Sequence, residues 1–338
     1  MSRDSSVEFI GEEQTNWKAI AGVATTVFVL LIGSVLAFDI AVPQRGIGAF
    51  TALSARAGLV LSVAGLVTQF GDPWFLLLVA IAVYLAGPKR SLLGSPREGA
   101  FVVAVTFSAF ALTDLLKTFF LAPRPPEAGT ATVPTWLPNA LEASFRSITT
   151  GSGYAFPSGH ALGTTVVVAA LAYKLDIGSR ALRWSTASVI VFLVAASRVV
   201  LGVHFLVDVV AGVFAGVSLF AVAAAIGSRG PGRVFVLGAG IGVLAVLMSA
   251  VSPSGAVWNA GQWLGGSIGA GIAWYVVQPS TSLTLPEAVG VGIPVGLLWV
   301  AVYLSSPSLL VTVFSTALAA GFAIAAPTLI DRVRLGRV

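Results

Sequence analysis

The sequence predicts an all-α protein, a polytopic bundle of transmembrane helices. Its 338 residues are 57% hydrophobic and only 10% charged, and the mean hydropathy is +0.94. Apolar runs of about 18 residues or more recur along the chain, and roughly 20 such residues cross the hydrocarbon core of a bilayer. The absence of cysteine excludes disulfides and thiolate chemistry. The net charge of +5 is spread in short clusters between apolar segments, so it does not predict nucleic-acid binding.

Ten apolar segments are long enough to be predicted as membrane spans. The first follows an acidic segment, 1–17, whose carboxylates argue against a signal peptide. A weaker apolar stretch, 47–70, is predicted to form interfacial or short re-entrant helices because Arg56 and Gln69 interrupt it. The ten predicted spans are 18–38, 73–88, 99–121, 157–174, 183–201, 204–226, 234–251, 256–277, 288–305 and 309–327.

The placement of basic residues predicts the orientation of these spans. If both termini are cytoplasmic, 13 of the 19 basic residues fall on the cytoplasmic side. Of the six outside, three belong to the polar motifs described next, which leaves three as background. Because cytoplasmic loops carry an excess of Lys and Arg, the sequence predicts a multi-pass protein of the cell membrane with its motifs on the extracytoplasmic side.

Three motifs of fixed spacing contain the scarce polar groups of the chain, including both of its histidines. A single intramembrane histidine could satisfy a helix–helix hydrogen bond, and a single arginine near a span end could snorkel to the interface. Three separate segments that converge on one membrane face favour a functional site. The motifs are Lys117 with Arg124-Pro125, Pro157-Ser158-Gly159-His160, and Ser197-Arg198 with His204 and Asp208.

The second motif is typical of the start of a helix that binds an anion. Pro157 suits the first helical turn, where its missing N–H costs nothing. The next three residues, 158–160, would present free backbone N–H groups at the positive end of the helix dipole. Gly159 would let a phosphate approach the backbone closely, and Ser158 would add a hydroxyl donor.

The third motif has the spacing of a nucleophile and its orienting group. His204 and Asp208 are four residues apart at the start of a predicted span, so they should share one helical face. The carboxylate could accept the imidazole N–H and leave the other nitrogen unprotonated toward an electrophile. The cations Lys117, Arg124 and Arg198 could neutralise the oxygens of a transferring phosphoryl group.

Together the motifs resemble the three signatures of the type 2 phosphatidic acid phosphatase and vanadium haloperoxidase superfamily, in its membrane lipid phosphatase branch, over about residues 50–226. The resemblance implies a six-span core and a metal-independent hydrolase without a cofactor. It implies that His204 attacks phosphorus, that Asp208 orients it, and that His160 protonates the leaving alkoxide. It assigns phosphate binding to Lys117, Arg124, Ser158, Gly159 and Arg198.

The expected activity is hydrolysis of a lipid phosphate monoester or a prenyl-type diphosphate through a phosphohistidine, as part of lipid metabolism. One alternative is a lipid phosphotransferase, in which an alcohol replaces water, since the phosphate machinery would be identical. Another is a transporter-like protein with a vestigial phosphatase half. Haloperoxidase activity is disfavoured because members with that activity are soluble. The expected partners are the lipid substrate and membrane lipids.

The predicted domains are a cytoplasmic segment at 1–17, a phosphatase core at 18–228 and an accessory region at 229–338. The accessory region carries the stripe Gly261, Gly265 and Gly269, which suits close helix packing within the chain or a homodimer seam. Asn259 and Gln262 add polarity there without a recognisable catalytic set. In the core, Asp114 could pair with Lys117 one turn later or bind another helix.

The polar connection at 125–156 joins the predicted third and fourth spans on the side of the motifs. It is predicted to be either a substrate lid or an ordinary solvated connector. A short helix within it is predicted from Glu142 and Arg146, which are spaced i,i+4.

Overall fold

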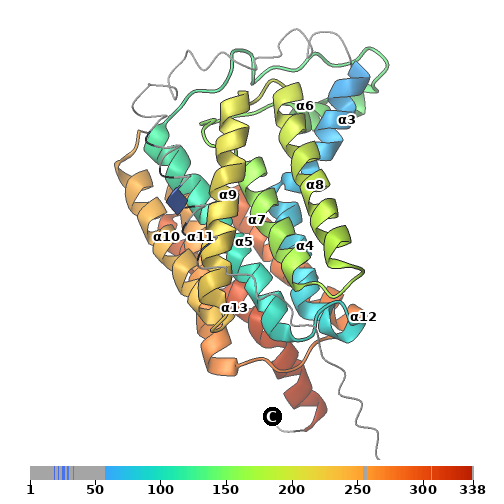
Figure 1. Cartoon of the computed structure of the whole chain (residues 1–338), viewed down its shortest axis with the longest axis vertical. Helices are drawn as coiled ribbons and strands as arrows, with labels where there is room; N and C mark the ends of the chain where they lie inside the picture. The colour runs from blue at the N-terminus through green and yellow to red at the C-terminus, as the bar shows by residue number, and fades with distance from the viewer. Residues whose placement is uncertain are drawn as a thin grey trace, which may run out of the picture.

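The computed structural model describes residues 58–253, 257–305 and 307–336, together with six single residues between 19 and 33. Over these ranges the chain forms an all-helical bundle without strands (Figure 1). Its α-helices are α3 (Gly58–Thr68), α4 (Pro73–Ala86), α5 (Pro96–Phe120), α6 (Glu142–Thr149), α7 (Gly159–Lys174), α8 (Arg180–Val200), α9 (Leu206–Gly227), α10 (Pro231–Val251), α11 (Val257–Val277), α12 (Leu285–Ser305) and α13 (Leu309–Arg334).

Six of these helices are long and apolar enough to cross a membrane, namely α5, α8, α9, α10, α12 and α13. A seventh span arises if Gly58–Gly71 and Pro73–Ala86, which meet at a bend of 46°, are counted as one. The described residues thus contain fewer spans than predicted. Helix α7 has only 16 residues, and Asn259 and Gln262 lower the hydropathy of α11. The first predicted span, 18–38, lies almost entirely outside the described residues.

Local sequence signals explain where several helices begin. Helix α5 starts at Pro96, whose missing N–H costs nothing in a first turn. The carboxylate of Glu98 accepts the N–H groups of Gly94 at 2.7 Å and Ser95 at 3.3 Å, which satisfies two donors at this end. Helix α4 starts at Pro73, directly after Asp72, so the bend between α3 and α4 falls at an Asp-Pro step.

The C-terminal helices share one hydrophobic core with the N-terminal part of the bundle. Buried side chains of α4, α5, α7 and α9 form a single cluster with those of α10 to α13. The hydroxyl of Tyr84 on α4 donates to the carbonyl of Ile324 on α13 at 2.6 Å, and Leu283 N–H donates to the Leu85 carbonyl at 2.8 Å. The helices that follow residue 228 therefore contribute side chains to the common core and do not form a separate unit beside it.

The glycine stripe of α11 is occupied within the chain. A Cβ atom at Gly261 would lie 2.7 Å from Leu309 Cδ1, and one at Gly265 would lie 2.9 Å from Val313 Cα. A Cβ at Gly269 would overlap the backbone of Ala317, also on α13. The small residues let the two helix backbones approach closely. The prediction of packing within the chain is confirmed for this stripe.

Candidate active site

The three motifs lie together at one end of the bundle. The C-terminal end of α5, the N-terminal end of α7 and the turn between α8 and α9 meet there, at the upper end of the molecule in Figure 1. A backbone hydrogen bond joins the second motif to the third, because Ser158 N–H donates to the carbonyl of Asp208 at 2.9 Å. Segments that are up to about ninety residues apart in sequence thus form one polar cluster.

His204 and Asp208 form a fully buried pair, with side chains 1% and 0% exposed. The imidazole Nδ1 lies 3.3 Å from Asp208 Oδ2, and the same oxygen accepts the backbone N–H of Phe205 at 3.0 Å. The expectation that both residues share a helical face is corrected. His204 precedes α9, which begins at Leu206, and Asp208 reaches back from the first turn of that helix. Capping geometry, rather than helical periodicity, brings the pair together.

Arg124 completes a chain of hydrogen bonds through the imidazole. One guanidinium nitrogen, Nη1, lies 3.1 Å from His204 Nε2 and donates to the Val203 carbonyl at 2.8 Å, while Nε donates to the Ser152 carbonyl at 2.9 Å. Because a guanidinium only donates, Nε2 is the acceptor and Nδ1 carries the proton that faces Asp208. This tautomer places the lone pair on Nε2, where it accepts the hydrogen bond of Arg124 and would be free to attack once that bond is released.

The electrostatic environment keeps this imidazole neutral. Burial lowers the pKa of His204 well below its ordinary value, and the positive charges of Arg124, Arg198 and Lys117 lower it further. Burial also lowers the pKa of Arg124 to about 10, although Asp208 opposes that shift. At neutral pH, Arg124 is therefore still charged, while His204 is an uncharged base.

The start of α7 differs by two residues from the prediction. Ser158, and not the residue before Pro157, is the N-cap, and the helix begins at Gly159. The Ser158 hydroxyl accepts Ala161 N–H at 3.4 Å, so it caps the helix and keeps its own proton as a donor. A Cβ at Gly159 would lie 2.7 Å from Thr113 Cγ2 and 3.8 Å from Lys117 Nζ. Gly159 is therefore required by the approach of α5 to α7, which brings Lys117 to the start of α7.

His160 lies near Asp72, a residue that the motifs did not indicate. Its Nε2 lies 3.7 Å from Asp72 Oδ2, too far for a hydrogen bond, and this buried nitrogen has no hydrogen-bond partner. Asp72 stands at the bend between α3 and α4, and in sequence it reads only as the residue before the helix-initiating Pro73. The carboxylate favours a protonated imidazole, but burial and the charge of Arg198 outweigh it and lower the pKa of His160 to about 4, so the imidazole is neutral at pH 7 without a bound anion.

Arg198 is also buried at the site, with 5% exposure. Its Nη1 donates to the hydroxyl of Thr68 on α3 at 2.7 Å, but its Nε has no hydrogen-bond partner. Electrostatic repulsion acts between Arg198 and Arg124 and between each of them and Lys117. Arg198 is buried and Lys117 and Arg124 are half-buried, and the carboxylates of Asp72, Asp114 and Asp208 offset part of their charge. An anion bound among the three cations would reduce the repulsion that remains between them. Among the described residues, no group of histidine and acidic side chains is arranged to hold a metal ion.

The connection between α5 and α7 reaches the site through Arg124. A Cβ at Gly151 would lie 2.8 Å from Arg124 Nη1, so this glycine lets the loop backbone pack against the guanidinium. Farther along, Arg146 and Glu142 of α6 form the predicted i,i+4 ion pair, with Nη2 and Oε1 2.7 Å apart. The loop therefore contacts the site rather than standing apart from it.

A helical bundle with a buried His–Asp pair among three cations is an arrangement that suits the binding of a phosphate. Comparison with known families agrees, since a model of the PAP2 superfamily matches residues 98–229, a range that contains all three motifs. This part of the chain is similar to that superfamily, and the apolar helices are those of a multi-pass membrane protein, which together support a function of the phosphatase type. No curated protein and no solved structure matches the chain significantly.

Proposed function

We propose that this protein hydrolyses a lipid phosphate monoester or a prenyl-type diphosphate at the extracytoplasmic face of the cell membrane, through a phosphohistidine on His204. The observation that carries the proposal is the hydrogen-bonded series from Arg124 through His204 to Asp208. It combines a neutral imidazole, an orienting carboxylate and a cation at the nitrogen that would attack.

In the first step, the guanidinium of Arg124 shifts from His204 Nε2 to the substrate phosphate. The Nε2 lone pair then forms a bond to phosphorus while the bond from phosphorus to the alkoxide breaks. His160 takes up a proton as the negatively charged phosphate binds beside it, with Asp72 stabilising the imidazolium, and donates this proton to the leaving oxygen. Asp208 balances the positive charge that develops on the His204 ring.

In the second step, water attacks the phosphohistidine. His160 now accepts a proton from that water, the bond between phosphorus and Nε2 breaks, and inorganic phosphate leaves. Lys117, Arg124 and Arg198 offset the negative charge of the phosphoryl oxygens in both steps. The unpartnered nitrogens of His160 and Arg198 support this assignment, because buried donors without partners are costly unless a ligand uses them.

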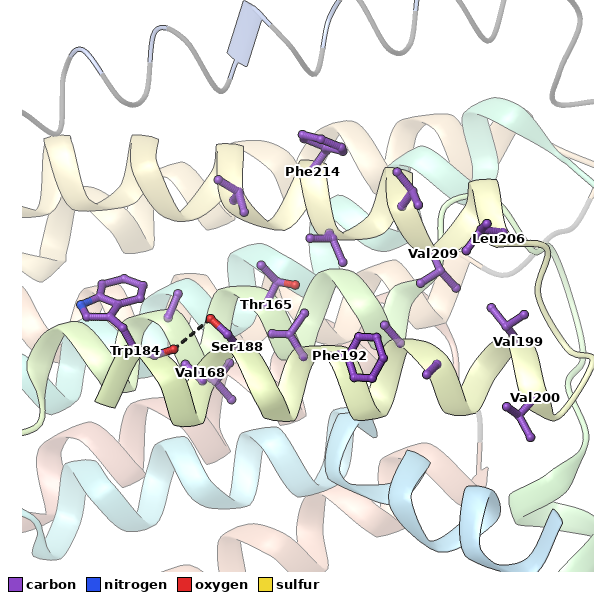
Figure 2. Close-up of a pocket in the computed structure, with 18 residues that line it drawn as sticks. Thr165, Val168, Trp184, Ser188, Phe192, Val199, Val200, Leu206, Val209 and Phe214 are labelled. Atoms are coloured by element: carbon purple, nitrogen blue, oxygen red, sulfur yellow. Dashed lines mark hydrogen bonds between the residues drawn. The ribbon is translucent and has the colours of Figure 1, made fainter. Parts of the chain in front are cut away.

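An apolar groove between α7, α8 and α9 supports a lipid as the substrate (Figure 2). Its volume is about 760 Å³. At one end, Val199 and Leu206 flank the turn that holds His204, and Trp184 lines the other end. The helical rise between residues 184 and 200 gives a length of roughly 24 Å, comparable with much of the hydrocarbon core. We propose that the hydrocarbon chain of the substrate lies in this groove.

The covalent step is tested with phosphate-labelled phosphatidic acid and prenyl diphosphate in a rapid-quench experiment. We expect acid-labile, base-stable label on wild-type protein, and no label and no turnover for His204→Ala. Asp176→Asn, an exposed carboxylate at the opposite end of the bundle, is the control and should label normally. Full turnover by folded His204→Ala would contradict the mechanism. Product formation only when an alcohol is supplied would instead favour phosphotransfer.

The groove is tested by filling it. Ala196→Trp adds an indole to the groove lining, whereas Leu193→Trp places one on the exposed side of the same helix. We expect Ala196→Trp to raise KM for long-chain substrates and to leave short-chain, detergent-soluble substrates unaffected, while Leu193→Trp changes neither. Equal effects of the two substitutions on both substrates would contradict this position for the lipid chain.

A further inference from the structure

A carboxylate of α5 that lies one turn before the phosphate-site lysine is bonded to α11. Asn259 Nδ2 lies 3.1 and 3.0 Å from the two oxygens of Asp114, and Trp263 Nε1 donates to Oδ2 at 3.0 Å. Gln262 Nε2 donates to Asn259 Oδ1 at 3.3 Å, which directs the amide nitrogen of Asn259 toward the carboxylate. Of the two interpretations of Asp114 from sequence, binding to another helix is the one observed.

Aromatic packing holds the donors of α11 in place. The ring centroids of Trp263 and Phe110 are 4.9 Å apart, and those of Trp263 and Trp299 are 5.9 Å apart. A Cβ at Gly266 would lie 2.6 Å from the ring of Phe107, so α11 approaches α5 as closely as a glycine allows. The Trp263 indole therefore has little freedom to turn its N–H away from Asp114.

Asp114 is also electrostatically linked to the phosphate site. It lies three residues before Lys117, so the two side chains are neighbours on the helix surface. Asp114 attracts the Lys117 ammonium, while Arg124 and Arg198 repel it. The ammonium itself stands near Gly159, at the start of α7. Within the described bundle no direct ion pair joins Asp114 to Lys117, so the carboxylate attracts the ammonium from beyond ion-pair distance.

We propose that Asn259 and Trp263 are positioning residues for the phosphate site. They fix the carboxylate of Asp114, and its charge keeps the Lys117 ammonium at the start of α7 against the repulsion of the two arginines. The inference rests on the proposed function. Both residues lie beyond 98–229, the range that the superfamily model matches, so the C-terminal region contributes to the site through a device that the superfamily segment does not contain.

The test compares two tryptophans of one aromatic cluster. Trp263→Phe keeps a ring against Phe110 and removes the N–H that Asp114 accepts, whereas the matched control Trp299→Phe removes an indole N–H that does not reach Asp114. We expect Trp263→Phe to lower kcat/KM roughly fivefold to tenfold and to weaken vanadate inhibition by a similar factor, since it removes a hydrogen bond to a charged group. Trp299→Phe should leave both unchanged.

A second variant, Asn259→Leu, tests the other hydrogen-bond donor to the carboxylate of Asp114. Asn259→Leu removes both amide contacts, and we expect a loss of about tenfold or more in kcat/KM and in vanadate affinity. Activities are normalised to the folded fraction of each preparation, and stabilisation by vanadate against thermal unfolding gives a binding readout that needs no substrate. A purely structural role would lower the folded fraction and leave the normalised values unchanged.

The outcomes separate this inference from the proposed function. A larger normalised loss in Trp263→Phe and Asn259→Leu than in Trp299→Phe supports it. Normalised activity and vanadate affinity equal to those of Trp299→Phe in both variants overturn it, while the proposed function stands. Wild-type protein that neither hydrolyses the substrates nor is stabilised by vanadate overturns the proposed function itself.

Discussion

The substitution Asp208→Asn tests the central pair of the site most directly. Asp208 Oδ2 accepts two hydrogen bonds, from His204 Nδ1 at 3.3 Å and from Phe205 N–H at 3.0 Å, and the side chain is fully buried. Hydrogen bonds to a charged acceptor contribute about 1.5–3 kcal/mol and those to a neutral one about 0.5–1.5 kcal/mol. The loss of charge should thus lower the free energy of unfolding by roughly 2–3 kcal/mol over the two bonds.

The effect of Asp208→Asn on the rate should be larger than its effect on stability. An amide can present its NH₂ group to Nδ1, and the imidazole proton would then move to Nε2, where it blocks the attack on phosphorus. In a comparable triad, loss of the orienting charge lowers kcat by about 10⁴-fold. We therefore expect a decrease of roughly 10³- to 10⁴-fold with a smaller change in KM.

The assay is phosphate release from a lipid phosphate in detergent micelles, with thermal unfolding measured on the same preparations. Asp176→Asn is the control, because that carboxylate is exposed and lies at the opposite end of the bundle. A folded Asp208→Asn protein whose kcat stays within about threefold of wild type would refute the reasoning, since His204 would then need no orienting charge.

Three further predictions concern the helix contact at the site, the orientation of the protein and the role of its C-terminal helices. Gly159→Ala should abolish activity and lower the free energy of unfolding by about 1–3 kcal/mol, because its Cβ would lie 2.7 Å from Thr113 Cγ2. Thr113→Ser removes that methyl group, so the double variant should regain stability in thermal unfolding. The chain has no native cysteine, and positions 144 and 177 lie at opposite ends of the bundle. A cysteine at Ser144 should therefore react with a membrane-impermeant reagent in intact cells, and one at Ile177 only after permeabilisation. The reverse pattern would contradict the proposed topology. A chain ending at Arg229 should fail to give a monodisperse protein in size-exclusion chromatography, because α5 loses its buried contacts with α10 and α11. A folded, active fragment would show that the C-terminal helices are separable from the core.

The hydropathy pattern predicts the fold class because membrane helices satisfy their backbone groups locally and need only a long apolar run. The positions of α5, α8, α9, α10, α12 and α13 follow from such runs. Over the described residues the same reasoning overestimates the number of spans, since it counts apolar stretches without regard to helix length or to what the helix faces. Helix α7 is short, and α11 carries polar side chains because it faces Asp114 and not lipid.

The motif spacing also predicts the composition of the site. Both histidines, Asp208 and the three cations lie at one end of the bundle, as their order on the predicted spans indicates. The local geometry could not be predicted to the same extent. Sequence spacing suggests a shared helical face for His204 and Asp208, but His204 stands before the helix, where chain direction and capping determine the contact.

Contacts between distant segments were decided only by the tertiary structure. Asp72 approaches His160 across 88 residues, and Asn259 and Trp263 reach Asp114 across 145 and 149 residues. Asp72, Asn259 and Trp263 belong to no fixed-spacing motif, and each has an ordinary local role, as the residue before Pro73 or as part of a helix. The sequence by itself determined which groups are chemically capable and at which end of the spans they stand. Helix packing decided which of these groups are in contact. The apolar face of a helix can pack against several other helices with similar energy, so the periodicity of the sequence does not predict which helix is its neighbour.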